Sequence, residues 1–302
     1  MTPYLFGELA ALAASVCFTI GPTLFTLAGR QVGSLTANRM RLLLGLAYLL
    51  GIHWLLFGRP YPAMAWQPLA AMLLSGVIGL ALSDVFLFEA FVLIGPRLTL
   101  LVLNLSPVLA TAMAWVGLGE RLRPLQIAAI GVVLGGVSWV VLERETPDRK
   151  GHSRNQHNPR GLLYALIAAI VGAVSILLAK IGMGYGLNPI SGATVRISGG
   201  MVVLWGWTML SGRLPSTWAA LKKHPRALGI IAIAVLIGPV AGISLSLLAL
   251  KNIPVGIATT LSSLPPVLLL PVAHWVFHEK ITPRAIVGTV VATGGVIWLL
   301  TM

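Results

Sequence analysis

The chain has 302 residues, of which 57% are hydrophobic and 10% are charged, and its formal net charge is +13. About a quarter of the residues of a soluble domain are charged, so this composition excludes an ordinary water-soluble protein. The basic residues form short clusters between apolar blocks rather than one continuous basic face, which disfavours a nucleic-acid-binding protein.

The apolar blocks predict ten membrane-spanning helices, because a bilayer core of about 30 Å requires about 20 apolar residues per helix. No lysine or arginine precedes Arg30, so the first block is expected to be a retained span and not a cleaved signal peptide. In chain order the expected spans cover residues 6–27, 36–57, 68–91, 98–118, 125–142, 162–183, 190–210, 227–250, 255–277 and 284–300.

One polar segment, residues 143–160, is rich in charged residues, histidine and asparagine, and its composition predicts a linker. The linker separates a first unit, residues 1–142, from a second unit, residues 161–302. Each unit contains five of the expected spans.

The two units repeat one another at a shift of 159 residues. Similar apolar composition alone does not align proline, glutamate and tryptophan at fixed spacing, so the pattern indicates a duplicated five-helix unit. Nearer the N-terminus, a slightly different shift pairs Arg39 with Arg196. The pairs at the shift of 159 include Pro107/Pro266, Glu120/Glu279, Arg121/Lys280, Pro124/Pro283, Gly136/Gly295 and Trp139/Trp298.

An odd number of spans in each unit places the second copy in the membrane upside down relative to the first. Inverted repeats are typical of transporters, in which the solute binds near the membrane midplane where the halves meet. The sequence therefore predicts an all-α integral membrane protein, with ten transmembrane helices arranged as a 5+5 inverted repeat around a central cavity. A monomer and a homodimer are both compatible with this pattern.

The segment from Pro107 to Gly136, which runs Pro-Val…Gly-Glu-Arg-Leu…Gly-Gly-Val, resembles the signature of EamA-type members of the drug/metabolite transporter superfamily. The segment from Pro266 to Gly295 is similar to the second copy of that signature. Arg39 and Arg196 resemble the arginines of the family's second and seventh helices. The resemblance covers the whole chain except the linker.

This resemblance implies a multi-pass protein of a bacterial inner membrane, whose third, fourth, eighth and ninth helices line the cavity. Known relatives carry amino acids, nucleotide sugars, sugars, choline-like cations and drugs, so the resemblance does not select a solute. It also implies that both termini are cytosolic.

The distribution of positive charge predicts the opposite orientation. The loops after spans two, four, six and eight hold four basic residues, whereas the opposite loops and adjoining helix ends hold fifteen. Because positive charge resists translocation, the charge count places the fifteen in the cytoplasm and both termini outside.

Charged groups inside a span are costly unless they are paired or hydrated, so each is a candidate functional residue. Asp84, next to Ser83 in the third expected span, is the candidate for binding a substrate ammonium group or a coupling proton. The alternative is an ion pair with Arg39, Arg196 or Lys180 that only holds helices together.

Neutral polar side chains in other spans extend this set. Asn104 corresponds to Ser263 at the shift of 159, Thr259 lies one turn before Ser263, and Ser244 lies in the eighth expected span. Such groups either bind a polar solute or form interhelical hydrogen bonds, each of which contributes about 0.6 kcal/mol.

The repeat-matched glutamates and prolines are expected to act in gating or packing and not in binding the solute. Glu120 and Glu279 each precede a basic residue, which predicts local ion pairs or gate elements. Pro107 and Pro266 are expected to contribute to gating or to packing, because proline interrupts a helix.

His274 and His278 lie four residues apart, but two ligands do not make a zinc site and the sequence fixes no third. No nucleotide-binding or other cofactor motif is present. The sequence therefore predicts neither a metal nor a cofactor.

We interpret the chain as a secondary transporter for a small polar metabolite, with amino-acid or other zwitterion export as the specific hypothesis and a proton as the candidate coupling ion. The expected cavity offers an acid, Asp84, and two bases, Arg39 and Arg196. Transport of an organic cation or drug is the first alternative. An intramembrane metal-dependent enzyme is the second.

Overall fold

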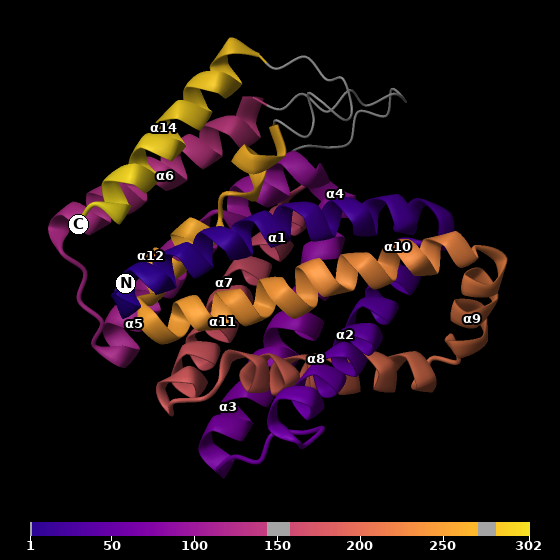
Figure 1. Cartoon of the computed structure of the whole chain (residues 1–302). Coiled ribbons are helices and arrows are strands. Elements are labelled where there is room, and N and C mark those ends of the chain that lie inside the picture. The colour runs from indigo at the N-terminus through magenta and orange to yellow at the C-terminus, as the bar shows by residue number, and fades with distance from the viewer. Residues whose placement is uncertain (1, 144–157, 271–281) are drawn as a thin grey trace.

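The computed structural model describes residues 2–143, 158–270 and 282–302. These residues form helices and contain no strand, which confirms the all-α prediction (Figure 1). Within the described residues, helical backbone covers the ten expected spans except at Asn104, Ser263 and Leu264.

The helices of the first unit begin with the longest one, α1, in which Pro22 lies inside the helix. They are α1 (Pro3–Val32), α2 (Ser34–Phe57), α3 (Trp66–Gly76), the π-helix η1 (Val77–Leu82), α4 (Ser83–Leu103), α5 (Leu105–Leu118) and α6 (Pro124–Glu143).

The second unit contains one additional short helix, α9, between its second and third spans. Its helices are α7 (Pro159–Gly184), α8 (Pro189–Leu210), α9 (Leu214–Lys223), α10 (Pro225–Val235), the π-helix η2 (Leu236–Gly242), α11 (Ile243–Asn252), α12 (Val255–Ser262) and α14 (Pro283–Leu300).

Among the described residues, eight helical segments are long and apolar enough to cross a membrane by length and composition. Helix α8 has spanning length but falls outside this set, because Ser191, Thr194, Arg196 and Ser198 make its sequence less apolar. The ninth expected span is described only as far as Leu270, as a shorter apolar helix.

Local sequence signals explain where several helices begin and end. The side chains of Thr2, Asn158, Asn188 and Thr282 each accept a hydrogen bond from a backbone N–H in the first turn of the helix that follows. Helix α5 ends at Gly119, whose φ of 66° lies in the left-handed region that favours glycine.

The two units interlock rather than lie side by side as separate bundles. Helix α1 packs against α10, η2 and α11 of the second unit, and α7 packs against α3, η1 and α4 of the first. Figure 1 shows α1 running alongside α10 and α11. The first helix of each unit thus packs against the third span of the other.

The fifth spans, α6 and α14, also pack against each other (Figure 1). The contact runs through glycines at matched positions. A methyl group at Gly136 would meet the backbone of Ala292, and one at Gly295 would meet Val133. Small residues allow helix backbones to approach closely in this way.

Two departures from regular α-helix recur at matched positions. The π-helices η1 and η2 begin at Val77 and Leu236, which the shift of 159 pairs. A turn at Asn104 separates α4 from α5, and a turn at Ser263, its matched residue, ends α12. The sequence predicted a loop at residues 92–97, but the backbone stays helical there and the break falls at Asn104.

Candidate functional site

A cavity of about 410 Å³ lies where the two units meet. Helices of both units line it, as expected for a solute site in an inverted repeat. Its lining comes from α1 (Phe18, Pro22, Phe25), α2 (Arg41), η1 (Leu80), the start of α5 (Ser106, Pro107), α7 (Ile176), α8 (Arg196), η2 and α11 (Pro239, Ser246) and the α12 region (Thr259, Ser262, Ser263).

Two arginines supply the charge of this cavity. Arg41 donates from Nη2 to Oδ2 of Asp84 at 2.6 Å, and their side chains are 26% and 18% exposed. Arg196 donates from Nη2 to the hydroxyl of Ser175 at 3.2 Å and has no acidic partner in the described part of the chain. The Nε atoms of both arginines are buried without a hydrogen-bond partner there.

Backbone packing fixes the position of Arg196. A side chain at Gly76 of α3 would overlap the carbonyl of Arg196. One helical turn further, at Gly79 of η1, a side chain would overlap the hydroxyl of Ser175, the partner of the guanidinium. Glycines of the first unit therefore hold the arginine of the second unit against α3 and η1.

Another part of the cavity lining carries hydroxyl groups from the α12 region. The Thr259 hydroxyl donates to the carbonyl of Val255 at 2.8 Å, and the Ser263 hydroxyl donates to the carbonyl of Thr260 at 2.8 Å. Each hydroxyl oxygen keeps acceptor capacity after donating its proton. The wall can therefore accept hydrogen bonds from a solute that carries N–H or O–H groups.

A second cavity of about 470 Å³ shares Phe18, Pro22, Leu103, Ser262 and Ser263 with the first. It extends along α1 toward Thr26, near the end of the helix that carries Arg30. Asn104 and Pro266 line this second cavity. The Asn104 amide also donates to Ser138 at 3.4 Å.

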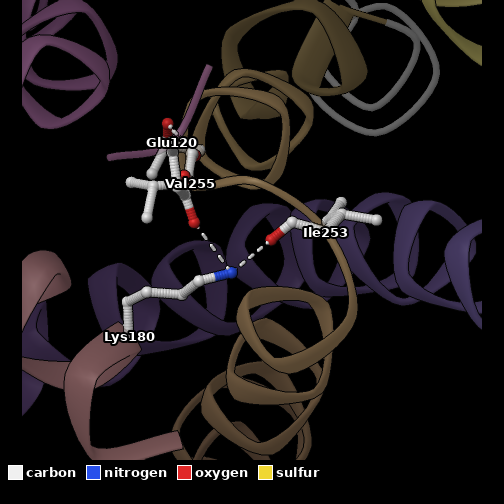
Figure 2. Close-up of polar contacts among 5 residues, drawn as sticks. Glu120, Lys180, Ile253 and Val255 are labelled. Atoms are coloured by element: carbon white, nitrogen blue, oxygen red, sulfur yellow. Dashed lines mark hydrogen bonds and ion pairs between the residues drawn. The ribbon is translucent and has the colours of Figure 1, made fainter. Parts of the chain in front are cut away.

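A polar cluster connects α7 with the segments that follow α5 and α11 (Figure 2). The Lys180 ammonium lies 3.0 Å from Oε1 of Glu120 and donates to the carbonyl of Ile253 at 2.8 Å. Oε2 of Glu120 accepts from the N–H of Val255 at 2.7 Å. We call these four residues the latch, because they join the end of α5, helix α7 and the α11–α12 connection.

The latch lies directly beyond the cavity lining. Lys180 is one helical turn from the cavity residue Ile176, and Val255 is one turn from Thr259. While these contacts hold, the connection after α11 stays against α5 and α7 at this end.

Several predicted residues lie away from the central cavity. Arg39 donates to the Thr217 hydroxyl of α9 at 2.6 Å. The hydroxyl of Ser83 donates to the carbonyl of Ala168 at 3.2 Å, and the hydroxyl of Ser244 is buried without a partner. None of the three is among the residues that line the two cavities described above.

The predicted partners of Asp84 differ from the observed one. Arg39, Arg196 and Lys180 were the expected candidates, whereas the structure pairs Asp84 with Arg41. The charge count placed Arg41, with Arg39, among the basic residues of the loops and adjoining helix ends. The sequence signal that distinguishes Arg41 from Arg39 is their spacing. Because residues two apart lie on different faces of a helix, Arg41 meets other neighbours of α2 than Arg39 does.

The predicted residues Glu279, His274 and His278 lie outside the described residues. Within the part of the chain that the structure describes, no group of three histidine, cysteine, aspartate or glutamate side chains is arranged to hold a metal ion.

Sequence reasoning also missed the acid Glu8, whose side chain is 2% exposed in α1. The sequence signal that could have identified Glu8 is an isolated glutamate near the start of an apolar segment.

Comparison with known proteins agrees with this architecture. One solved crystal structure aligns with 98% of this chain and 95% of its own, with a TM-score of 0.71 and 19% sequence identity, which shows likeness of fold. No curated protein matches the sequence.

The family model of the EamA-like transporter family matches residues 5–142 and again residues 159–301. The two matches correspond to the two interlocked helical units. The chain belongs to the EamA-like transporter family, and it is a multi-pass membrane protein of the transporter type.

Proposed function

We propose that this chain is a secondary transporter of a bacterial inner membrane that exports a small metabolite bearing a carboxylate, with an amino acid as the best candidate. The observation that carries this proposal is Arg196, a cation in the cavity without an acidic partner in the described part of the chain. A buried guanidinium is costly unless an anionic group pairs with it. A substrate carboxylate meets this need.

The rest of the cavity suits the remainder of an amino acid. The hydroxyls of Thr259 and Ser263 can accept from an ammonium group, and Phe18 and Phe25 offer an apolar surface for a side chain. The cavity volume of about 410 Å³ falls within the range of small-molecule sites.

The alternative of an organic-cation transporter has less support. Asp84, the acid that would bind such a cation, already pairs with Arg41. A cation entering the cavity would also meet the repulsion of Arg196.

Transport by alternating access requires that the latch open while the opposite end of the cavity closes. The interlocked packing of α1 and α7 supports this proposal, because each unit's first helix moves with the other unit's third span. Inverted repeats give two related conformations of this kind.

The test is ligand binding to detergent-purified full-length protein, measured as a thermal shift with L-amino acids, dicarboxylates and choline. Ligands that bind the native state raise its apparent stability. We expect stabilisation by an amino acid or another carboxylate. Stabilisation by choline alone would contradict the proposal.

The variant Arg196→Gln is expected to weaken binding of the stabilising ligand about 10- to 100-fold, because a hydrogen bond to a charged group contributes about 1.5–3 kcal/mol. Arg226→Gln, at the exposed start of α10, is the matched control and should bind normally. Equal affinities of Arg196→Gln and the wild type would refute the role of this arginine.

A further inference from the structure

Glu8 is a carboxylic acid that the proposed solute site does not use. It lies in the second turn of α1, its side chain is 2% exposed, and its Oε1 atom is buried without a hydrogen-bond partner. An ionised carboxylate in such surroundings carries a large desolvation cost, which a proton on the group removes.

In the described part of the chain, the ionisable groups on the neighbouring elements form no salt bridge with Glu8. On α1 itself, the Tyr4 hydroxyl interacts electrostatically with Glu8 and with Arg123, and it accepts a hydrogen bond from Gln126 of α6. On α11, the Lys251 ammonium donates to the carbonyls of Gly186 and Leu187. Lys180, which contacts the α11–α12 connection, pairs with Glu120.

The other helices packed against α1 add no counter-charge. On α2, Arg41 pairs with Asp84, Arg39 donates to Thr217, and both ring nitrogens of His53 have partners. Arg226 of α10 lies about 26 residues, or roughly 39 Å of helix, from the end of α11. Helices η2 and α12 carry no ionisable side chain. Glu8 therefore forms no ion pair within the described residues.

Glu8 shares a face of α1 with the cavity. Residues seven apart lie on one side of a helix, so Glu8, Ser15 and Pro22 follow one line, and Pro22 lines the cavity. Ser15 is 0% exposed, as is Ala11 between it and Glu8. Phe18, the first cavity residue of α1, lies ten residues from Glu8, or about 15 Å along the helix.

Glu8 also lies at the latched end of the molecule. A methyl group added at Gly7 would meet the side chains of Asn252 and Ile253, and the carbonyl of Ile253 is the one that binds Lys180. The movement that opens the latch therefore moves the segment that packs against Gly7, the residue before Glu8.

We infer that Glu8 is a proton-binding site of the transport cycle, protonated while the latch is closed and deprotonated when water reaches this end. This inference rests on the proposed function for its place in a cycle. The step is a reversible proton transfer between the Glu8 carboxyl group and water, so no other reactant is required.

The first test detects the proton without any solute. Infrared spectra of the purified full-length protein at neutral pH should contain a protonated-carboxyl C=O band that Glu8→Gln removes and Glu89→Gln retains. Glu89 is an exposed acid of α4 and serves as the matched control. Absence of the band from the wild type, or its persistence in Glu8→Gln, would overturn the proton site.

The second test measures coupling in proteoliposomes with a mixture of radiolabelled L-amino acids. A gradient of one pH unit should raise wild-type accumulation about tenfold for one proton per neutral solute, since one pH unit corresponds to 1.36 kcal/mol. Glu8→Gln should exchange solute but show no response to the gradient, whereas Glu89→Gln should respond as the wild type does.

The two tests separate the possible failures. An infrared band that depends on Glu8, in a protein that moves no amino acid, refutes the proposed substrate and leaves the proton site in place. Transport by the wild type with an unchanged gradient response in Glu8→Gln refutes the coupling role of Glu8.

Discussion

Lys180 and Glu120 hold together three segments that are distant in sequence. The ammonium group also binds the carbonyl of Ile253, and the carboxylate binds the N–H of Val255 (Figure 2). Loss of either side chain leaves charged or polar partners without their contacts, so the closed arrangement should lose more free energy than an exposed ion pair contributes.

We expect Glu120→Ala to open the latched end more often. A single cysteine at Thr259, in a protein with Cys17→Ser, should then react about tenfold faster with a charged maleimide, because a loss of about 1.4 kcal/mol changes a population tenfold. Glu89→Ala is the control. A failure of Glu120→Ala to change the labelling rate would contradict the gating role.

Gly76 determines how closely α3 approaches α8. A methyl group there would overlap the carbonyl of Arg196, so Gly76→Ala should force the helices apart and lower stability by about 1–3 kcal/mol. Gly206→Ala on α8 is the matched control, because no atom lies within 4 Å of its added methyl group. Thermal unfolding in detergent compares the two, and equal melting temperatures would contradict the close contact.

At the scale of elements, hydropathy predicted the location of the helices better than the positions at which an α-helix gives way to a π-helix. The expected spans at residues 6–27 and 125–142 fall inside α1 and α6, because a long apolar segment in lipid must satisfy its backbone within a helix. The π-helices η1 and η2 were not predicted, because their residues are as apolar as ordinary helix interior.

For the candidate site, too, the sequence predicted individual residues better than the way in which they pair. Arg196, Thr259 and Ser263 were predicted from polar residues in apolar segments, and all three line the central cavity. The pairing of Asp84 with Arg41 depends on how α2 and α4 are rotated, and the repeat pattern does not specify that rotation.

The π-helix η1 is expected to act as a bend in the third span. A π-helix carries one extra residue in a turn and leaves its backbone hydrogen bonds less regular, and such sites are frequent in functional helices. Deletion of Leu82, at the end of η1, should convert the segment to regular α-helix and keep the phase of the flanking helices. We expect solute binding to persist and transport to fall about tenfold, or by about 1.4 kcal/mol of activation free energy.

The control for this deletion is Leu82→Ala, which removes the side chain and keeps the residue count. Binding is read from the thermal shift and transport from proteoliposome flux. Undiminished transport by the deletion variant would show that the π-helix is not required for the conformational change.

At the scale of the whole molecule, one end carries a cluster of exposed basic residues. Helix α9 and its flanks carry Lys222, Lys223 and Arg226, all exposed, near the end of α1 that carries Arg30. The two termini lie together at the other end (Figure 1). Because positive charge resists translocation, the end that carries α9 should face the cytoplasm.

A reporter fused to the C-terminus tests this orientation. We expect a C-terminal alkaline phosphatase to be active and a C-terminal green fluorescent protein to be dark, since both termini should lie outside. The same reporters inserted after Lys223 should give the opposite pair of signals. Fluorescence of the C-terminal fusion would instead support the cytosolic termini that the family resemblance implies.

The packing of α1 against α10 and α11 has a consequence during biosynthesis. About 190 residues separate the end of α1 from the start of α10, so at about 5–20 residues per second the partner helices emerge roughly 10–40 seconds after α1. Until then the face of α1 that carries Glu8 lacks the helices that cover it in the finished protein. Nascent chains that stop before Pro225 should therefore be retained by insertion factors or degraded, whereas chains that extend beyond Asn252 should become resistant to proteolysis.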